Sequence, residues 1–151
     1  NWTKLKILSD YCHQKGFKFL LEVLRGLDVL NAQSAINIIH ELRKNRIEPD
    51  VWKLEGMENK DDYIKVVGKI QEENRTNVGL VILGRGESRE KVEQWIKAGK
   101  DVKGVIGFAV GRTMFSQPLL DYKNGNIDKE QLIKKISNNF QHLYKLFTSQ
   151  S

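Results

Sequence analysis

The chain has 151 residues, of which 40% are hydrophobic and 29% charged, a composition that supports one folded domain and excludes a disordered tail. Its formal charge is +6, but lysines and glutamates are interleaved, as in GESREKVEQWIKAGKD, so we expect no nucleic-acid-binding surface. Apolar runs such as VGLVIL and VIGFAV are much shorter than the roughly 18 residues of a membrane span, and no signal-peptide layout opens the chain, so we expect a cytoplasmic protein without membrane contact.

Helical and strand-like patterns alternate along the whole sequence. A first helix is expected over Thr3 to Gln14. Four apolar strands follow, at FKFLLEVL (17–24), DVWKLEG (50–56), VGLVILG (78–84) and GVIGFAVG (104–111). The helices between them are expected to begin at a Ser34 cap and end before Pro49, then to run over Lys60 to Glu73 and over Ser88 to Ala98. After the segment MFSQPLLDYKNG, a last helix is expected to be capped by Asp128.

This alternation predicts parallel strands joined by crossover helices. Four βα units preceded by one helix are half of an eight-stranded barrel, so we predict the C-terminal half of a TIM (β/α)8 barrel, as a single half-barrel domain over residues 1–151. A flavodoxin-like open parallel sheet is the alternative. Half a barrel exposes two strand edges, so we also expect either a homo-oligomer or a missing N-terminal half-barrel as partner.

The helical periodicity predicts which side chains face the core. They are Ile64, Val67 and Ile70 in the second crossover helix, Val92, Trp95 and Ile96 in the third, and Leu132, Ile133, Ile136, Phe140, Leu143 and Phe147 on the apolar face of the last helix.

We expect neither a metal nor a cofactor. The three histidines, His13, His40 and His142, are scattered without ligand spacing, and we interpret them as solvated. Cys12 is the single cysteine of the chain and is interpreted as a small buried hydrophobe.

A lysine interrupts the second apolar strand. Alternation of side chains in DVWKLEG puts Lys53 and Glu55 on one face and Trp52 on the other. Lys53 is then expected near the catalytic edge of the sheet, where an amine kept partly dry can act as a nucleophile. Glu22 ends the preceding strand, so an acid and an amine should lie side by side, as proton transfer around an imine requires. A structural ion pair, or a lysine that reaches solvent from a strand end, is the competing interpretation.

Two glycine-rich segments, LGRGES and VGRTMF, end the last two strands. Glycines let backbone N–H groups approach an anion closely, and the N-terminus of a following helix adds positive potential. Arg85 and Arg112 could add charge-assisted contacts. In barrels the phosphate site is often built from the loops after the last two strands, so we predict a phosphate site here, with two ordinary glycine turns as the alternative. Its residues are Gly84, Arg85, Gly86, Gly111 and Arg112.

The segments PDVWKLEG, VILGRGES and above all GVIGFAVGRTMFSQPLLDY strongly resemble the C-terminal half of a bacterial barrel family of the 2-deoxy-5-keto-gluconate 6-phosphate aldolase type. That family is sometimes fused behind a sugar kinase of inositol catabolism. The layout is more distantly similar to class I tagatose bisphosphate aldolases, in which FLE and LKxE segments carry the acid and the Schiff-base lysine. The resemblance covers nearly the whole chain.

The resemblance implies a class I aldolase, a carbon–carbon lyase that acts on a phosphorylated keto sugar or sugar acid. Lys53 would form an iminium with the substrate ketone, Glu22 would move protons, and Glu55 would orient Lys53 or the substrate hydroxyls. The first half of the barrel would supply further polar residues, so an isolated half can be inactive. The alternative function is a non-catalytic phosphosugar-binding or regulatory module.

Overall fold

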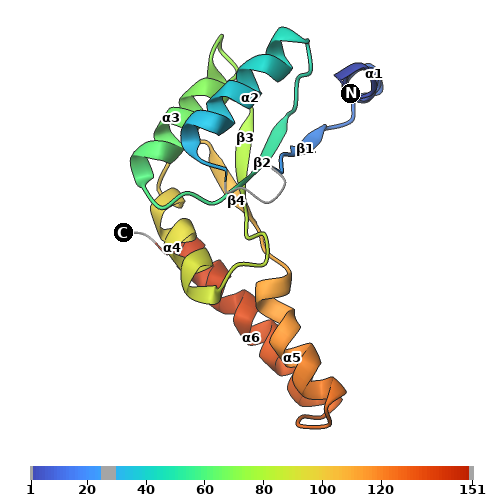
Figure 1. Ribbon diagram of the computed structural model, residues 1–151, viewed down its shortest axis with the longest axis vertical. Helices are drawn as coiled ribbons and strands as arrows, with labels where there is room; N and C mark the ends of the chain where they lie inside the picture. Colours follow the sequence, from blue (N-terminus) through green and yellow to red (C-terminus); the bar gives the residue numbers. More distant parts are fainter. Residues whose placement is uncertain (1, 25–29, 150–151) are drawn as a thin grey trace.

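The computed structural model describes residues 2–24 and 30–149 of the protein (Figure 1). The described elements, in chain order, are α1 (Trp2–Gln14), β1 (Leu20–Glu22), α2 (Ala32–Lys44), β2 (Val51–Glu55), α3 (Lys60–Gln71), β3 (Gly79–Leu83), α4 (Arg89–Gly99), β4 (Val105–Ala109), α5 (Arg112–Lys123) and α6 (Lys129–Thr148). None of these helices combines the length and the apolar composition needed to cross a membrane.

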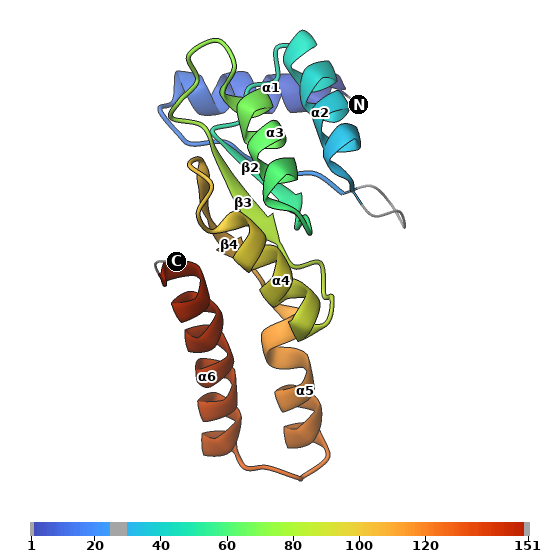
Figure 2. The same ribbon diagram turned by 90° about the vertical axis from the view of Figure 1, so that its left-hand side faces the viewer.

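The strands form one parallel sheet in the order β1-β2-β3-β4, so every strand pairs with its neighbour in the chain. The helices α2, α3 and α4 all lie on the same side of this sheet (Figures 1 and 2). A flavodoxin-like sheet requires a reversal of strand order and helices on both faces, whereas a barrel is wound in one direction. The predicted α/β fold of four parallel βα units after one helix is therefore confirmed, and the flavodoxin alternative is wrong.

The core lies between the sheet and these three helices. Trp52 and Leu54 of β2 point into it and are at most 2% exposed, as the strand alternation predicts. The inward positions predicted for α3 and α4 are confirmed with one exception, because Ile64 is 50% exposed. Tyr63 takes its place: the ring is fully buried, and the hydroxyl accepts from the Met57 amide at 3.0 Å and donates to the Trp95 carbonyl at 3.1 Å.

Two local predictions need correction. The cap of α2 is Asn31 rather than Ser34: the Asn31 side chain accepts a hydrogen bond from the Ser34 amide at 2.8 Å, so the cap lies three residues before the predicted one. The first strand covers only Leu20–Glu22, within a predicted apolar run of eight residues. Cys12 is half-buried and packs against the core, close to its predicted place.

The segment that follows β4 is a helix, α5, although it contains Pro118. A proline inside a helix cannot donate to the carbonyl four residues earlier, here that of Met114. The side-chain amide of Asn139 in α6 donates to this Met114 carbonyl at 2.8 Å. The bond that Pro118 removes is thus replaced from the neighbouring helix, which allows α5 to continue.

Helices α5 and α6 run antiparallel and extend beyond the sheet (Figure 2). The predicted Asp128 cap is confirmed, with a reciprocal capping box formed by Gln131. The apolar face of α6 is only partly covered, because Leu143 is buried while Phe140 is 48% exposed. Phe140 contributes to an aromatic cluster with Phe108 of β4, at 6.2 Å between ring centroids.

Asp50 joins the amino ends of the first two strands and should make the fold acid-sensitive. Its carboxylate accepts hydrogen bonds from Lys18 at 2.8 Å and from the Phe19 amide at 2.9 Å, and lies 3.3 Å from His13. Burial opposes the charged form, but these hydrogen bonds and the Lys18 charge outweigh it and lower the pKa of Asp50. Because the folded-state pKa is depressed, the stabilisation is complete above the unfolded value of about 4 and is lost as the pH falls through the folded value.

We therefore expect the free energy of unfolding to fall between about pH 5 and pH 3 more steeply in the wild type than in Asp50→Asn. At pH 6 the variant should be less stable by about 1 kcal/mol, because an amide oxygen accepts these bonds more weakly. Urea titrations across this pH range measure both effects. Parallel pH profiles for the two proteins would contradict the assignment.

Candidate active site

Lys53 lies in the middle of β2, on the face of the sheet opposite to α2, α3 and α4. In the strand register it stands beside Glu22 of β1 and Val81 of β3. Residues at the same height on parallel neighbours point to the same face. The Lys53 Nζ atom lies 2.7 Å from Glu22 Oε2, and the two side chains are 21% and 36% exposed. The structure thus brings the predicted amine and acid into direct contact.

The surroundings of this pair are apolar but open. Leu20 of β1 is 51% exposed on the same face, and Val51 and Val81 are half-buried. At the far edge, a β-bulge between β3 and β4 leaves Ile106 as an extra residue, 56% exposed and packed over Gly79. The amine is therefore flanked by hydrocarbon and remains accessible from the uncovered side of the sheet.

Glu55, at the end of β2, has other partners than Lys53. It is 1% exposed, and its Oε2 accepts a hydrogen bond from the Leu30 amide at 2.7 Å, just before α2. Its Oε1 forms an ion pair with Arg85, from the loop after β3. A carboxylate this deeply buried requires such partners, because burying it alone would cost several kcal/mol.

The loop after β3 forms a tight turn over Gly84–Glu87. The Glu87 amide donates to the Gly84 carbonyl at 3.0 Å, and the two central residues, Arg85 and Gly86, have φ values of 51° and 87°. Two consecutive positive φ angles of this size define a type I′ turn. A Cβ atom on Gly86 would lie 2.8 Å from the Arg112 guanidinium carbon, so this glycine allows the close approach of the next loop.

The loop after β4 is tied to this turn. Gly111 precedes the first turn of α5, the Arg112 guanidinium donates to the Arg85 carbonyl at 2.5 Å, and the Thr113 hydroxyl donates to the Glu87 carbonyl at 2.8 Å. The five predicted phosphate-binding residues therefore lie together at neighbouring strand ends. The N-terminus of α5, where the Met114 amide donates to the Gly111 carbonyl at 2.8 Å, also points its positive end toward these loops, which is the usual setting for an anion.

Two participants in this arrangement were not predicted from the sequence. One is the Leu30 amide, and a backbone donor in a loop leaves no signal in the sequence. The other is Thr113, whose hydroxyl bonds to the Glu87 carbonyl in a different loop, so no local pattern in the sequence indicates the contact.

Comparison with known proteins places the chain in a family. A family described as "Uncharacterized protein conserved in bacteria (DUF2090)" matches residues 2–151. The chain belongs to the DUF2090 family. No curated protein matches the sequence.

Among solved structures, the DUF2090 chain is similar to a Schiff-base-forming fructose-1,6-bisphosphate aldolase. The TM-score is 0.56 at 18% sequence identity, and the match covers 75% of this chain and 44% of the aldolase chain. At this identity the likeness shows the fold alone, an aldolase-like barrel architecture. The chain spans less than half the length of the aldolase that it matches.

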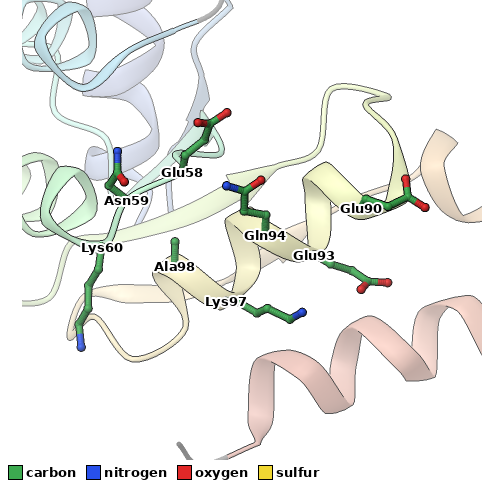
Figure 3. Close-up of a pocket in the computed structure, with 8 residues that line it drawn as sticks. All are labelled: Glu58, Asn59, Lys60, Glu90, Glu93, Gln94, Lys97 and Ala98. Carbon is green, nitrogen blue, oxygen red and sulfur yellow. The ribbon is translucent and has the colours of Figure 1, made fainter.

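A groove of about 670 Å³ lies elsewhere on the DUF2090 chain, in its outer helical layer (Figure 3). It is lined by Glu58, Asn59, Lys60, Glu90, Glu93, Gln94, Lys97 and Ala98. The residues come from the loop after β2, the start of α3 and the exposed side of α4, and His142 of α6 contacts Glu93 at 2.8 Å. Lys53 and Glu22 do not line this groove. Within residues 2–24 and 30–149, no group of three or more His, Cys, Asp or Glu side chains is arranged to hold a metal ion.

Proposed function

We propose that this chain carries the amine-bearing half of a class I aldolase-type lyase, which acts on a phosphorylated keto sugar or sugar acid. The observation that supports this most directly is the 2.7 Å contact between Lys53 and Glu22 on adjacent parallel strands. The aldolase-like fold adds the context, since active sites of barrels form at the carboxyl ends of the strands.

In this proposal the two side chains exchange protons around one covalent step. Glu22 accepts a proton from the Lys53 ammonium, and the neutral amine adds to the ketone carbon of the substrate. Glu22 returns the proton to the resulting hydroxyl, which leaves as water and produces the iminium. The iminium then accepts the electron pair of the neighbouring carbon–carbon bond as that bond breaks, while the ionised Glu22 takes the proton of the hydroxyl on the departing carbon, which becomes a carbonyl.

The phosphate of the substrate would bind at the two interlocked loops. The turn at Arg85 and Gly86 and the first turn of α5 after Gly111 would present backbone amides, and Arg112 adds a positive charge beside Gly86. Gly84 would contribute to the shape of the turn, because its own amide donates to the Ala109 carbonyl at 3.4 Å. These donors lie in the loops after β3 and β4, the two strands that follow β2 in the sheet. With the phosphate bound there, the carbon chain of the substrate would run along the open face of the sheet and bring its carbonyl group to Lys53.

Several narrower expectations remain part of the proposal. They are a substrate of the 2-deoxy-5-keto-gluconate 6-phosphate type from inositol catabolism, a cytoplasmic location, and catalysis without metal or cofactor. Residues 1–151 would act as a single half-barrel unit. Its uncovered face and its edges β1 and β4 would be completed by further strands, either from an N-terminal half-barrel or from a second copy of the chain.

Reductive trapping tests the proposal. The protein in its full natural length is incubated with dihydroxyacetone phosphate, a phosphorylated ketone, and reduced with sodium borohydride. Peptide mass spectrometry is expected to find the reduced adduct on Lys53, and excess inorganic phosphate is expected to suppress it. An adduct confined to other lysines, or none, would count against the aldolase mechanism.

The non-catalytic phosphosugar-binding module is the second candidate, and one observation favours it. The contacts that join the two glycine-rich loops, from Arg112 to Arg85 and from Thr113 to Glu87, involve neither Lys53 nor Glu22. The loops could therefore hold a phosphate without the amine. Phosphate binding by a wild-type protein that forms no adduct with any ketone would select this candidate.

A further inference from the structure

We propose that Glu55 is a positioning residue for the phosphate-binding turn, acting through its ion pair with Arg85 rather than on Lys53. The inference rests on the proposed phosphate site, but not on the aldolase chemistry. It assigns to Glu55 a role in phosphate affinity instead of a role in orienting the amine.

The turn contains a residue that disfavours its own conformation. Arg85 has a φ of 51°, in the left-handed region where any residue with a Cβ is strained, and where a type I′ turn normally has Gly, Asn or Asp. The Arg85 side chain extends back to Glu55. A buried ion pair that requires this conformation can hold the arginine in it, which explains how the turn persists without glycine at that position.

Glu55 is also fixed from a second direction. Its other oxygen accepts from the Leu30 amide at 2.7 Å, so the carboxylate links the loop after β1 to the loop after β3 across the end of β2. Arg112 then continues the series by donating to the Arg85 carbonyl. One set of contacts, Leu30–Glu55–Arg85–Arg112, thus connects the start of α2, the end of β2 and the loops after β3 and β4.

The direction of the Arg85 side chain separates the two roles of this residue. Its guanidinium is engaged with Glu55, whereas its amide belongs to the turn that would face the phosphate. Loss of the Glu55 charge should therefore change the shape of the turn first. The contact between Lys53 and Glu22 involves neither Glu55 nor Arg85, so loss of the Glu55 charge should leave it unaffected.

The first experiment compares wild type with Glu55→Gln, which keeps the acceptor for Leu30 and removes the charge. Calorimetric titration with inorganic phosphate should show an affinity about tenfold weaker, equivalent to one charge-assisted contact. The rate of borohydride trapping at saturating dihydroxyacetone phosphate should be unchanged. Glu58→Gln is the matched control, because Glu58 is an exposed glutamate in the loop that directly follows Glu55 and pairs with Lys91. Its phosphate affinity should equal that of the wild type.

The second experiment is a rescue. In Glu55→Gln/Arg85→Gly, the glycine adopts a positive φ without strain and keeps the backbone amide of the turn. We expect this double variant to regain most of the lost phosphate affinity. If it binds phosphate as weakly as Glu55→Gln, or if Glu55→Gln binds as tightly as the wild type, the positioning role is wrong.

The readouts also separate this inference from the proposed function. A wild type that binds phosphate but traps no ketone would defeat the aldolase proposal and leave the phosphate titrations to decide the role of Glu55. A Glu55→Gln protein with normal phosphate affinity and slow trapping at saturation would show that Glu55 acts on the amine, and would overturn the inference. A wild type that binds no phosphate would overturn it as well.

Discussion

Replacing Lys53 with methionine is expected to abolish imine trapping and to lower the rate of carbon–carbon cleavage by on the order of 10⁴-fold or more. Methionine has a similar length and keeps the apolar contacts of the stem, but it has no amine to bond to the ketone. The loss should appear in kcat, measured with the natural-length protein. Phosphate affinity should stay at the wild-type value, because the phosphate loops do not depend on Lys53.

Two further variants give this experiment its controls. Glu22→Gln keeps the shape of the acid but cannot exchange protons, so we expect a smaller loss, about 10²- to 10⁴-fold, together with an altered pH profile. Lys65→Met changes a lysine that is 64% exposed on α3 and should behave as the wild type. Undiminished cleavage by Lys53→Met would exclude the Schiff-base mechanism.

The second large effect concerns stability. Arg85→Met removes the charged partner of Glu55, which is 1% exposed. An uncompensated buried carboxylate typically costs about 3–5 kcal/mol, so we expect the free energy of unfolding to fall by that amount. Denaturant titration measures the loss, and circular dichroism checks that the variant is folded before it is compared.

A double variant separates the effect of the unpaired charge on stability from the effect of lost packing. Glu55→Gln/Arg85→Met lacks both charges of this ion pair and keeps the acceptor for Leu30, so most of the lost stability should return. Arg89→Met removes an arginine that is 47% exposed and pairs with Glu93, and it should cost at most about 1 kcal/mol. An equal loss in Arg85→Met and Arg89→Met would mean that the Glu55–Arg85 pair contributes no more than a surface contact.

The strand pattern was sufficient to predict the fold. The apolar runs around β2, β3 and β4 are bounded by turns and separated by segments with helical periodicity. This alternation predicts parallel strands with crossover helices without knowledge of which strands pair. Capping was less predictable. Ser34 and Asn31 both have side chains that can cap a helix, and only the backbone conformation decides that Asn31 is used.

Helix α5 was missed because the information lies outside its own sequence. Pro118 indicates a break when only neighbouring residues are considered. The acceptor that it leaves free, the Met114 carbonyl, is satisfied by Asn139, which is far along the chain on another helix. No local pattern contains that contact.

The candidate site was likewise predictable from the sequence only in part. Glu22 and Lys53 could be placed together from the sequence because consecutive parallel strands were expected to lie side by side, and the register pairs the two residues directly. Glu55 was expected beside Lys53 because alternation puts both on one face. The type I′ turn at Arg85 instead brings a guanidinium to Glu55, and the occurrence of this turn at an arginine could not be read from the letters LGRGES.

The consecutive order of the strands also bears on how the molecule is made. Each strand docks on the one synthesised just before it, as in the step from Glu22 to Lys53, so no segment has to wait for a distant part of the chain. Nearest-neighbour pairing of this kind limits the loop-closure entropy of each step to one crossover connection. The sheet can therefore grow strand by strand as the polypeptide leaves the ribosome, with its amino-terminal edge ordered first.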